Sequence, residues 1–492
     1  MKNTKRILTA MLALLTIAGT AASCGNDTTD PGKTTSKNPS TQTGTDDGIK
    51  DNLPELNFNN DTIKILHFGY EMIGDTPDWN REGDNIADAV ASRDLATEER
   101  LGVTIEYAKG SDDWYAYPAE VKKLTQSGDC PYDLIFMESS QCFKLALENC
   151  FLDISDLDYV DLEQPWWYKD FMDGSSISTD KRFLLTGAFS ISTLEGASCT
   201  IFNKTLYNNY FESYHDLYDM VEAGTWTYDA LIELCRDAYD NVNGNTEADE
   251  GDIFGMFNRG IKTANYMSMS TGLTYLDRDE DGLPVLNLYN EDSLRWVETL
   301  HEILTNSEIA YTNPDVDGIE HFVSGKAVFF PGTLAEFTSY EVRNMNDPHG
   351  VLPMPVLDEG MKYMSAAATV NGQSAVIPTT APDNRLEIAG AVMESLCIEG
   401  YRSVLPAWYD VALKGKHADD ERDADMIDII YDTIDTSFIM AADKLLGTGT
   451  FFFDMLVNDK KTPGEFASYY ETKSSNLNKK WKDMLDNYAN LE

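Results

Sequence analysis

Positive charge is scarce in this sequence. Its 492 residues include 38 lysine and arginine residues against 83 aspartate and glutamate residues, which gives a formal net charge of −45. A surface of that sign repels phosphate backbones, so nucleic acid is a poor partner and we predict none. It also disfavours adsorption to anionic lipid headgroups. Solubility alone would explain the charge, which says nothing about the fold.

Motifs of catalysis and metal binding are missing as well. The chain has no GxSxG, no HExxH and no Gly-rich phosphate loop, and its seven cysteines form no CxxC pair. These absences argue against a catalytic nucleophile of a known motif and against a zinc site. We therefore predict that the protein binds no cofactor and is not an enzyme. A pair of glycosidase carboxylates has no fixed motif, so a surface carbohydrate-active hydrolase stays open as the alternative.

Long apolar runs are absent after residue 24, so no later segment is predicted to span a membrane. The one long apolar run, residues 7–22, follows Lys2, Lys5 and Arg6. It leads into the sequence AASC, which ends at Cys24. This order is typical of an export signal, and the run is shorter than the roughly twenty residues that a bilayer requires. Small residues before a cysteine resemble the lipobox of bacterial lipoproteins, although Ala21 stands where leucine is usual. That resemblance implies lipidation of Cys24, and plain secretion is the alternative.

The segment after this cysteine is poor in anything that could be buried. Residues 25–50 are mostly Thr, Ser, Gly, Asp, Asn and Lys, a composition that favours a flexible tether. We therefore expect a signal peptide at 1–23, a tether at 24–56, and a folded part from 57 onward. The folded part is long enough for two or three domains.

Six cysteines lie in the folded part: Cys130, Cys142, Cys150, Cys199, Cys235 and Cys397. Export permits disulfides, and the first three are close enough in sequence to invite one. Buried free thiols are the equally open alternative.

Alternating patterns predict the first half of the fold. Residues 62–68, 103–107 and 132–137 are expected to be strands, with helices at 85–102 and 118–127 between them. This order implies a parallel sheet with helices on both faces, where ligands bind beyond the carboxyl ends of the strands. Those ends are Phe68-Gly69-Tyr70 and Glu138-Ser139-Ser140.

Further elements are expected along the rest of the chain. Strands are predicted at 184–189, 197–202, 327–330 and near 373–377. Thr227 is predicted to cap a helix at 228–239, and Asp281-Gly282 a hairpin turn. Other helices are predicted at 292–306, 315–324, 384–399, 423–435 and 469–491.

Several local patterns together resemble the extracellular solute-binding lipoproteins that feed ATP-driven sugar importers. They are YDLIFM (132–137), CTIFNKTL (199–206), TWTYDALIELCRDA (225–238), FVSGKAVFFPGT (322–333) and the segment 408–430. The resemblance implies a periplasmic-binding-protein-like α/β fold of two lobes, each a sheet flanked by helices, joined by a hinge that the chain crosses more than once. It places lobe one at 57–190 plus 322–370 and lobe two at 191–321 plus 371–492. The crossings would lie near 190–196, 315–322 and 369–372.

The implied function is capture of a carbohydrate, most simply a neutral sugar or oligosaccharide, and its delivery to ABC permease subunits. The protein would be a monomer, anchored by lipid at the outer face of the cytoplasmic membrane. An adhesin without a transporter partner is a third possibility. Sugar binding needs flat aromatic rings for the C–H faces and amides or carboxylates for the hydroxyl groups. The candidates near expected strand ends and loops are Tyr70, Glu71, Trp79, Glu138, Ser139, Gln141, Glu195, Thr333, Glu336, Trp408, Tyr409 and Asp410.

Each candidate has a structural alternative. Trp408 and Tyr409 could pack between helices, and Glu138 and Glu195 could be hinge scaffold. Trp166 and Trp167 are expected to be packing anchors. A weak calcium pattern, Asn241, Asn243, Asn245, Asp249 and Asp252, has Thr246 at the position that needs glycine, so a solvated loop is favoured over a metal site.

Overall fold

The computed structural model describes residues 50–69, 76, 85–178, 180–245, 248–273, 275–280, 282–312, 318–367, 372–414, 420–436 and 438–491. A first sheet has the strand order β12-β3-β1-β2 and is formed by β1 (Asp61–His67), β2 (Val103–Lys109), β3 (Leu134–Glu138) and β12 (Gln373–Val376). β1 runs parallel to both β2 and β3, as the sequence predicts, and β12 is antiparallel to β3.

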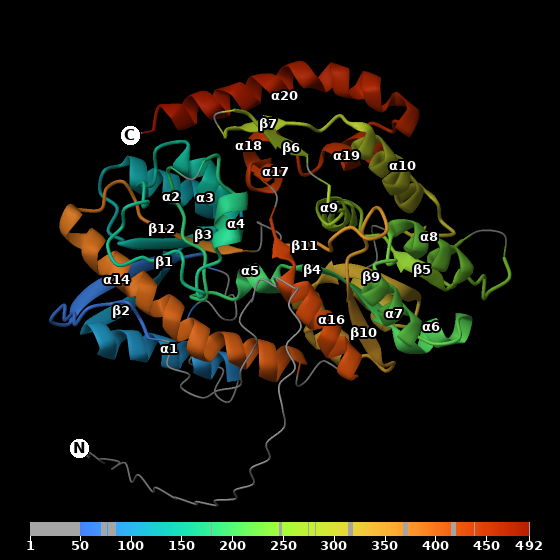
Figure 1. Cartoon of the computed structure of the whole chain (residues 1–492), viewed down its shortest axis with the longest axis horizontal. Coiled ribbons are helices and arrows are strands. Elements are labelled where there is room, and N and C mark those ends of the chain that lie inside the picture. Colours follow the sequence, from blue (N-terminus) through green and yellow to red (C-terminus); the bar gives the residue numbers. More distant parts are fainter. Residues whose placement is uncertain are drawn as a thin grey trace, which may run out of the picture. The chain divides into compact units, whose positions relative to one another are not determined.

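Helices cover both faces of this sheet. Figure 1 shows α1 (Asn85–Leu101) and α14 (Asp383–Glu399) along one face, and α2 (Ala116–Gln126) and α3 (Ser139–Ala146) on the other. All five residues of β3 are buried, which is why its sequence is a continuous apolar run instead of an alternating one. The expected β-α-β-α-β order and its two covering layers are therefore confirmed.

Trp166 and Trp167 anchor the loop that follows this unit, as expected. Both side chains are buried, and their Nε1–H groups donate to the two carboxylate oxygens of Glu394 on α14, at 3.0 and 2.9 Å. Burial raises the pKa of Glu394 to about 7. The carboxyl group is thus the polar centre of an otherwise apolar contact between this loop and α14.

A second sheet has the order β10-β4-β9-β5-β8. Its strands are β4 (Ser198–Asn203), β5 (Phe254–Phe257), β8 (Ala310–Tyr311), β9 (Ala327–Thr333) and β10 (His349–Pro353). β4 is antiparallel to β9 and β10, whereas β5 is parallel to β8 and β9. The helices around it include α6 (Lys204–Tyr210), α7 (His215–Ala223), α8 (Tyr228–Asp237), α9 (Ile261–Met269) and α10 (Glu291–Thr305). Thr227 caps α8 as predicted, because its side chain accepts a hydrogen bond from Ala230 N–H.

The strand pairing corrects the predicted division of the chain. The prediction placed residues 322–370 in the first lobe, but β9 and β10 both hydrogen-bond to β4 of the second sheet. It placed residues from 371 onward in the second lobe, but β12 pairs with β3 and α14 packs on α1. The physical reason is that the outer edge of β3 needs a backbone partner, and β12 supplies it. The other predicted lobe boundaries stay predictions.

One predicted strand is also wrong. Residues 184–189 form isolated bridges instead of a strand, the main one between Leu185 and Ala375, whose backbone groups exchange two hydrogen bonds of 2.9 Å. This segment therefore reaches the sheet at one point only, beside β12.

Shorter elements lie between the strands and the longer helices. They are α4 (Lys169–Gly174), α5 (Ser192–Glu195), α11 (Gly318–Val323), α12 (Leu334–Phe337), α13 (Tyr340–Arg343), β11 (Ser365–Ala366) and β13 (Ile434–Asp435), together with the predicted hairpin β6 (Leu276–Arg278) and β7 (Pro284–Leu286).

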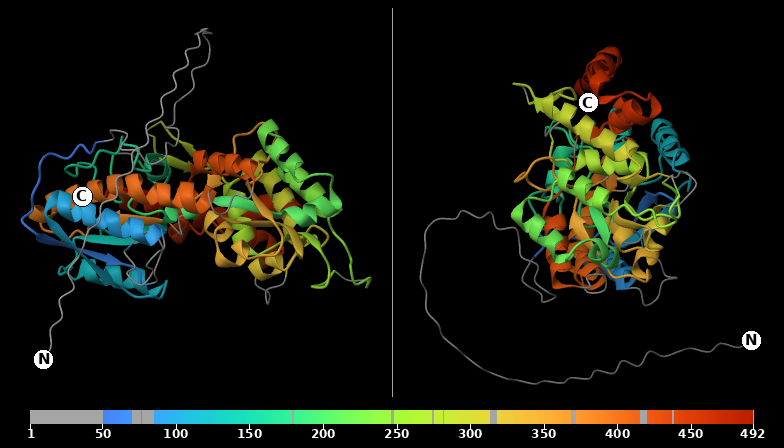
Figure 2. Two further views of the ribbon diagram at one scale, coloured as in Figure 1. Left: turned by 90° about the horizontal axis from the view of Figure 1, so that it is seen from below. Right: turned by 90° about the vertical axis from the view of Figure 1, so that its right-hand side faces the viewer.

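The C-terminal part of the chain is helical. It runs through two π-helical segments, η1 (Gly400–Val404) and η2 (Ala407–Lys414), and then through α16 (Glu421–Asp432), α17 (Phe438–Ala441), α18 (Asp443–Leu446), α19 (Phe451–Phe453), η3 (Asp454–Asn458), η4 (Pro463–Glu465) and α20 (Phe466–Ala489). Figures 1 and 2 show α20 on the side opposite α1 and α14. Among the described residues, no helix combines the length and the apolar character that crossing a bilayer requires.

Candidate functional site

A pocket lies at the carboxyl ends of β1 and β3. It is small and partly open to solvent. One part of its lining is aromatic and the other is polar; the residues are Phe68, Trp114, Tyr117, Pro118, Met137, Glu138, Gln141 and Gln373. The structure thus brings together two of the predicted ligand-binding residues, Glu138 and Gln141, at the sheet edge where the parallel topology predicts a site.

Two glycines hold the loops after β1 and β2 together. Gly69 N–H donates to Ser111 O at 3.0 Å, and Gly110 N–H donates to His67 O at 2.8 Å. A Cβ on Gly69 would lie 2.5 Å from the carbonyl oxygen of Gly110, so only glycine allows this approach.

The close approach of these loops assembles an aromatic wall. The ring of Phe68 meets Trp114 edge to face at 5.2 Å, and its centroid lies 5.6 Å from that of Tyr117. Tyr117 is fixed further because its hydroxyl group donates to Phe136 O at 2.9 Å. The three rings thus pack together without a ligand, and such preorganisation lowers the entropy cost of binding.

Glu138 is the charged group of the pocket. It is the last residue of β3 and only 7% exposed. The Ser140 hydroxyl donates to its Oε1, and Lys444 Nζ lies 3.9 Å from the same oxygen. Burial raises the pKa of Glu138 to about 7, while Lys444 and Ser140 act in the opposite direction. The carboxyl group can therefore change its charge near neutral pH.

Ser139 belongs to the scaffold behind this pocket. It is 1% exposed, its hydroxyl donates to Gly372 O at 3.0 Å, and it also bonds Ser374 Oγ at 2.8 Å. Ser374 Oγ in turn bonds Thr186 Oγ1 at 2.8 Å. These hydroxyl groups tie α3 to the start of β12, so the predicted ligand role of Ser139 is not supported by its position.

Thr333 and Glu336 form the capping box of α12. The Thr333 side chain accepts from Glu336 N–H, and the Glu336 carboxylate accepts from Thr333 N–H and pairs with Arg259 at 2.6 Å. Their polar atoms are thus used by local structure. Glu195 is the last residue of α5, and two residues separate it from the start of β4. None of the three lines the aromatic pocket.

Trp408 and Tyr409 lie in the core, which contradicts their predicted exposure to a ligand. They are 1% and 4% exposed and belong to a hydrophobic cluster with Ile427 and Ile430 of α16. The Tyr409 hydroxyl donates to Asp428. The packing alternative fits these contacts. Tyr70, Glu71, Trp79 and the side chain of Asp410 lie outside the described residues.

The weak calcium pattern forms a loop that satisfies its own polar groups. Asn243 Nδ2 and Asn245 Nδ2 donate to the two oxygens of Asp249, at 2.8 and 2.5 Å. Both oxygens of the Asp249 carboxylate thus accept hydrogen bonds from amide nitrogens, which cannot bind a cation. Within the described ranges, no group of three or more His, Cys, Asp or Glu residues could hold a metal ion.

The cysteines that follow the tether are free thiols. Cys130 is half-buried, and Cys142, Cys150, Cys199, Cys235 and Cys397 are buried. The disulfide suggested by the spacing of the first three is therefore wrong.

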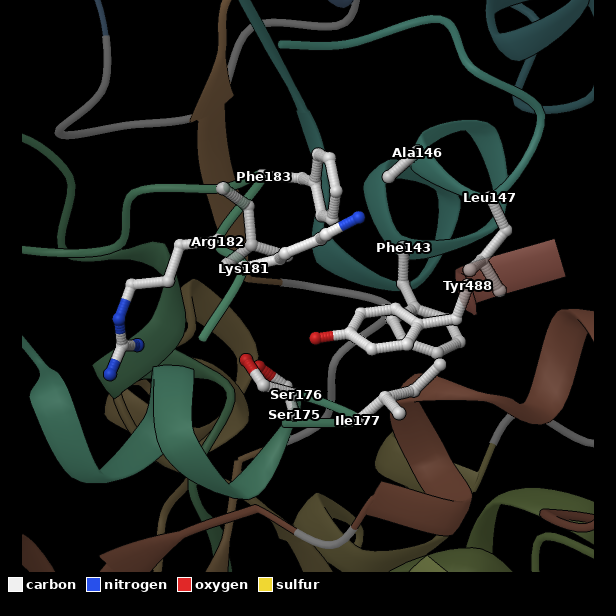
Figure 3. A pocket seen from close by; sticks show the side chains of 11 residues that line it. Phe143, Ala146, Leu147, Ser175, Ser176, Ile177, Lys181, Arg182, Phe183 and Tyr488 are labelled. Atoms are coloured by element: carbon white, nitrogen blue, oxygen red, sulfur yellow. The ribbon is translucent and has the colours of Figure 1, made fainter. Parts of the chain in front are cut away.

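A second cavity lies between α3, residues 175–177 and 181–184, and α20 (Figure 3). This cavity is also small and partly open to solvent. Most of its polar groups are already bonded: the Lys181 ammonium donates to Leu491 O, and the Ser175 and Ser176 hydroxyls donate to Met172 O at 3.1 and 2.6 Å. The exception is Arg182, whose Nη1 has no hydrogen-bond partner among the described residues. Sugar hydroxyl groups would find few partners there, so the aromatic pocket is the better candidate.

Six of the eight residues that line the aromatic pocket, among them Trp114 and Gln373, were not among the predicted ligand-binding residues. Trp114 opens the aromatic segment WYAY (114–117), which follows β2 and stands at the same sheet edge as Glu138. That position was a usable signal. Gln373 was not identifiable, because its strand was assigned to the other lobe; in the structure it is the direct pairing partner of Glu138.

The sheets and the position of the pocket define a two-lobed binding-protein fold. Residues 82–392, more than half of the chain, match the bacterial extracellular solute-binding proteins, and the chain belongs to this family. This is a family of solute-binding proteins, so the prediction of a binding protein is confirmed. No curated protein matches the chain.

Solved structures confirm the fold. An ABC substrate-binding protein from Listeria monocytogenes, in complex with cycloalternan, is similar over 86% of this chain and 99% of its own, with a TM-score of 0.56 and 12% identity. A solute-binding protein from Thermotoga lettingae bound with α-D-tagatose is similar over 86% of this chain and 100% of its own, with a TM-score of 0.53 and 14% identity. The GacH receptor of Streptomyces glaucescens, solved unliganded and with acarbose, is similar over 85% of this chain and 98% of its own, with a TM-score of 0.54 and 13% identity.

Proposed function

We propose that this protein captures a neutral sugar or oligosaccharide in the aromatic pocket and delivers it to an ABC permease. The observation that carries the proposal is the pairing of the Phe68–Trp114–Tyr117 wall with Glu138, Gln141 and Gln373 in one pocket. Aromatic rings cover the C–H faces of a pyranose, and carboxylate and amide groups pair with its hydroxyls. The sugars bound by the three similar structures support the same ligand class.

Capture would work by a population shift. A ligand that touches the first sheet's pocket and groups from the second part of the chain favours the closed form by its differential affinity for that form. The permease would then recognise the closed protein, which acts as a monomer. Lipid on Cys24 and the tether 24–56 would hold it at the outer face of the cytoplasmic membrane.

Isothermal titration calorimetry tests the ligand site. The mature protein is titrated with glucose, galactose, maltose, cellobiose and maltotriose. Trp114→Ala should weaken binding of the best sugar at least about tenfold, the loss expected for one stacked ring. Tyr115→Ala is the matched control, because this neighbouring ring is 84% exposed and does not line the pocket. Steady release of a hydrolysis product, or equal affinity for both variants, would contradict the proposal.

Radiolabelled palmitate tests the anchor. Cells that express the full-length chain should label it, and Cys24→Ser should abolish the label. Cys130→Ser is the control, since Cys130 is the one described cysteine that is not fully buried. Uptake of the bound sugar by the source bacterium should fall when the chain is deleted or unanchored. Normal uptake without the chain would refute delivery to a permease.

A further inference from the structure

Lys444, from the far end of the sequence, lies close to Glu138 of the aromatic pocket. It lies on α18, which contacts both α3 and α20, and Figure 1 shows α17 and α18 next to α3. Leu446 of α18 belongs to the same hydrophobic cluster as Trp481 of α20. Lys444 itself is 28% exposed and lies 3.9 Å from Glu138, whose side chain is 6% exposed.

The surroundings of Glu138 make this lysine its main electrostatic support. From α3, the Ser140 hydroxyl donates to it, and the Cys142 thiol stays neutral because burial raises its pKa well above the usual range. From β12, Gln373 is its antiparallel partner. From α18, Asp443 opposes ionisation and Lys444 favours it. The balance leaves the pKa of Glu138 at about 7.

We propose that Lys444 is a positioning residue for the ligand site, which favours the ionised form of Glu138 so that its carboxylate can accept hydrogen bonds from ligand hydroxyl groups. This inference rests on the proposed function. It also names the ligand chemistry: a polyol with two neighbouring hydroxyl groups, which both donate to one carboxylate.

The chemistry gives the sign of the pH dependence. An ionised carboxylate accepts at both oxygens, whereas the protonated acid must donate from one of them and loses an acceptor. Two hydroxyl donors therefore prefer the ionised form. Affinity should rise with pH through the titration of Glu138 and level off above it. Removal of the lysine charge moves this rise to higher pH, because an opposite charge at this distance favours ionisation.

Calorimetry between pH 5.5 and 9, with the panel sugar that binds tightest, tests the inference. Lys444→Gln should weaken binding about fivefold at pH 7, as the ionised fraction of Glu138 falls from about half to a small minority, and should approach wild-type affinity at pH 9. Lys444→Arg should restore the wild-type profile. Lys480→Gln is the control. Lys480 lies on α20, and its Nζ donates to Leu446 O of α18 at 3.2 Å without contacting Glu138. Glu138→Gln should flatten the profile.

The outcomes separate the two proposals. If no sugar binds the wild-type protein, the proposed function fails and this inference with it. If sugars bind but Lys444→Gln weakens them equally at every pH, or Lys444→Arg does not restore the profile, only the inference is overturned. A ligand-free measurement adds independence: the infrared carboxyl signal that disappears in Glu138→Gln should titrate at higher pH in Lys444→Gln than in wild type. An unchanged titration would overturn the role of Lys444.

Discussion

Replacement of Trp408 separates packing from ligand binding at a position where the sequence favours a ligand and the structure favours the core. The side chain is 1% exposed, and its Nε1–H has no hydrogen-bond partner among the described residues. Trp408→Ala should therefore lower the free energy of unfolding by about 3–5 kcal/mol, through lost contacts and a cavity. Neither Trp408→Ala nor the milder Trp408→Phe should change sugar affinity measured under native conditions.

Trp408→Phe makes the reasoning quantitative. Loss of the second ring costs about 1–2 kcal/mol of buried apolar contact. Removal of an unpaired buried N–H returns about 1–3 kcal/mol. The two terms offset, so the free energy of unfolding should stay within about 1 kcal/mol of wild type.

Trp226→Phe is the matched control, because Trp226 is 0% exposed but its Nε1–H donates to Pro353 O at 2.9 Å. This substitution leaves a buried carbonyl unpaired and should cost about 1–3 kcal/mol more than Trp408→Phe. Urea unfolding followed by circular dichroism at 222 nm measures both. If Trp408→Phe cost as much as Trp226→Phe, or if it kept stability but lost sugar affinity, the packing assignment would be refuted.

Three further predictions concern other parts of the fold. Gly69→Ala should destabilise the protein by about 1–3 kcal/mol and weaken sugar binding, because its Cβ would collide with Gly110 O, whereas Gly464→Ala, which has open space around it, should do neither. Thr227→Ala should cost about 1 kcal/mol in urea unfolding, the value of a lost helix cap. Glu394→Gln should flatten the pH dependence of stability. Because the folded pKa of Glu394 is about 7 and its usual value is 4.5, wild-type stability includes a contribution that is present below pH 4.5 and is lost as pH rises through 7. An identical slope in both proteins between those values would contradict it.

Local pattern was enough for the elements whose neighbours are close in sequence. The alternation in 62–68 and the apolar run at 132–137 predict β1 and β3, and Thr227 predicts the start of α8, because strand faces and caps depend on adjacent residues. Pairing over long distances was not predictable. Nothing in the sequence around Gln373 shows that it returns to Glu138, and this is why the lobe assignment failed for β9, β10 and β12.

Burial was the other limit. A tryptophan at a predicted loop edge, such as Trp408, has the same local sequence pattern whether it stacks on a ligand or packs on α16, and only the tertiary arrangement decides. Trp114 shows the converse case. Its position after β2 indicates the ligand-binding edge of the sheet, but the polar residues before it are typical of an exposed loop. Of the candidate site, the sequence therefore predicted the sheet edge, Glu138 and Gln141, but not the wall opposite them.

The pairing of β3 with β12 also constrains how the polypeptide can be made. The strand partners Glu138 and Gln373 are 235 residues apart in the sequence. During synthesis from the amino end, this edge of β3 therefore stays unpaired until most of the chain has been made. Until then β3 presents unpaired backbone groups and apolar side chains, a state prone to misassociation. Maturation should accordingly be slow and late, and fragments that stop short of residue 373 should depend heavily on chaperones.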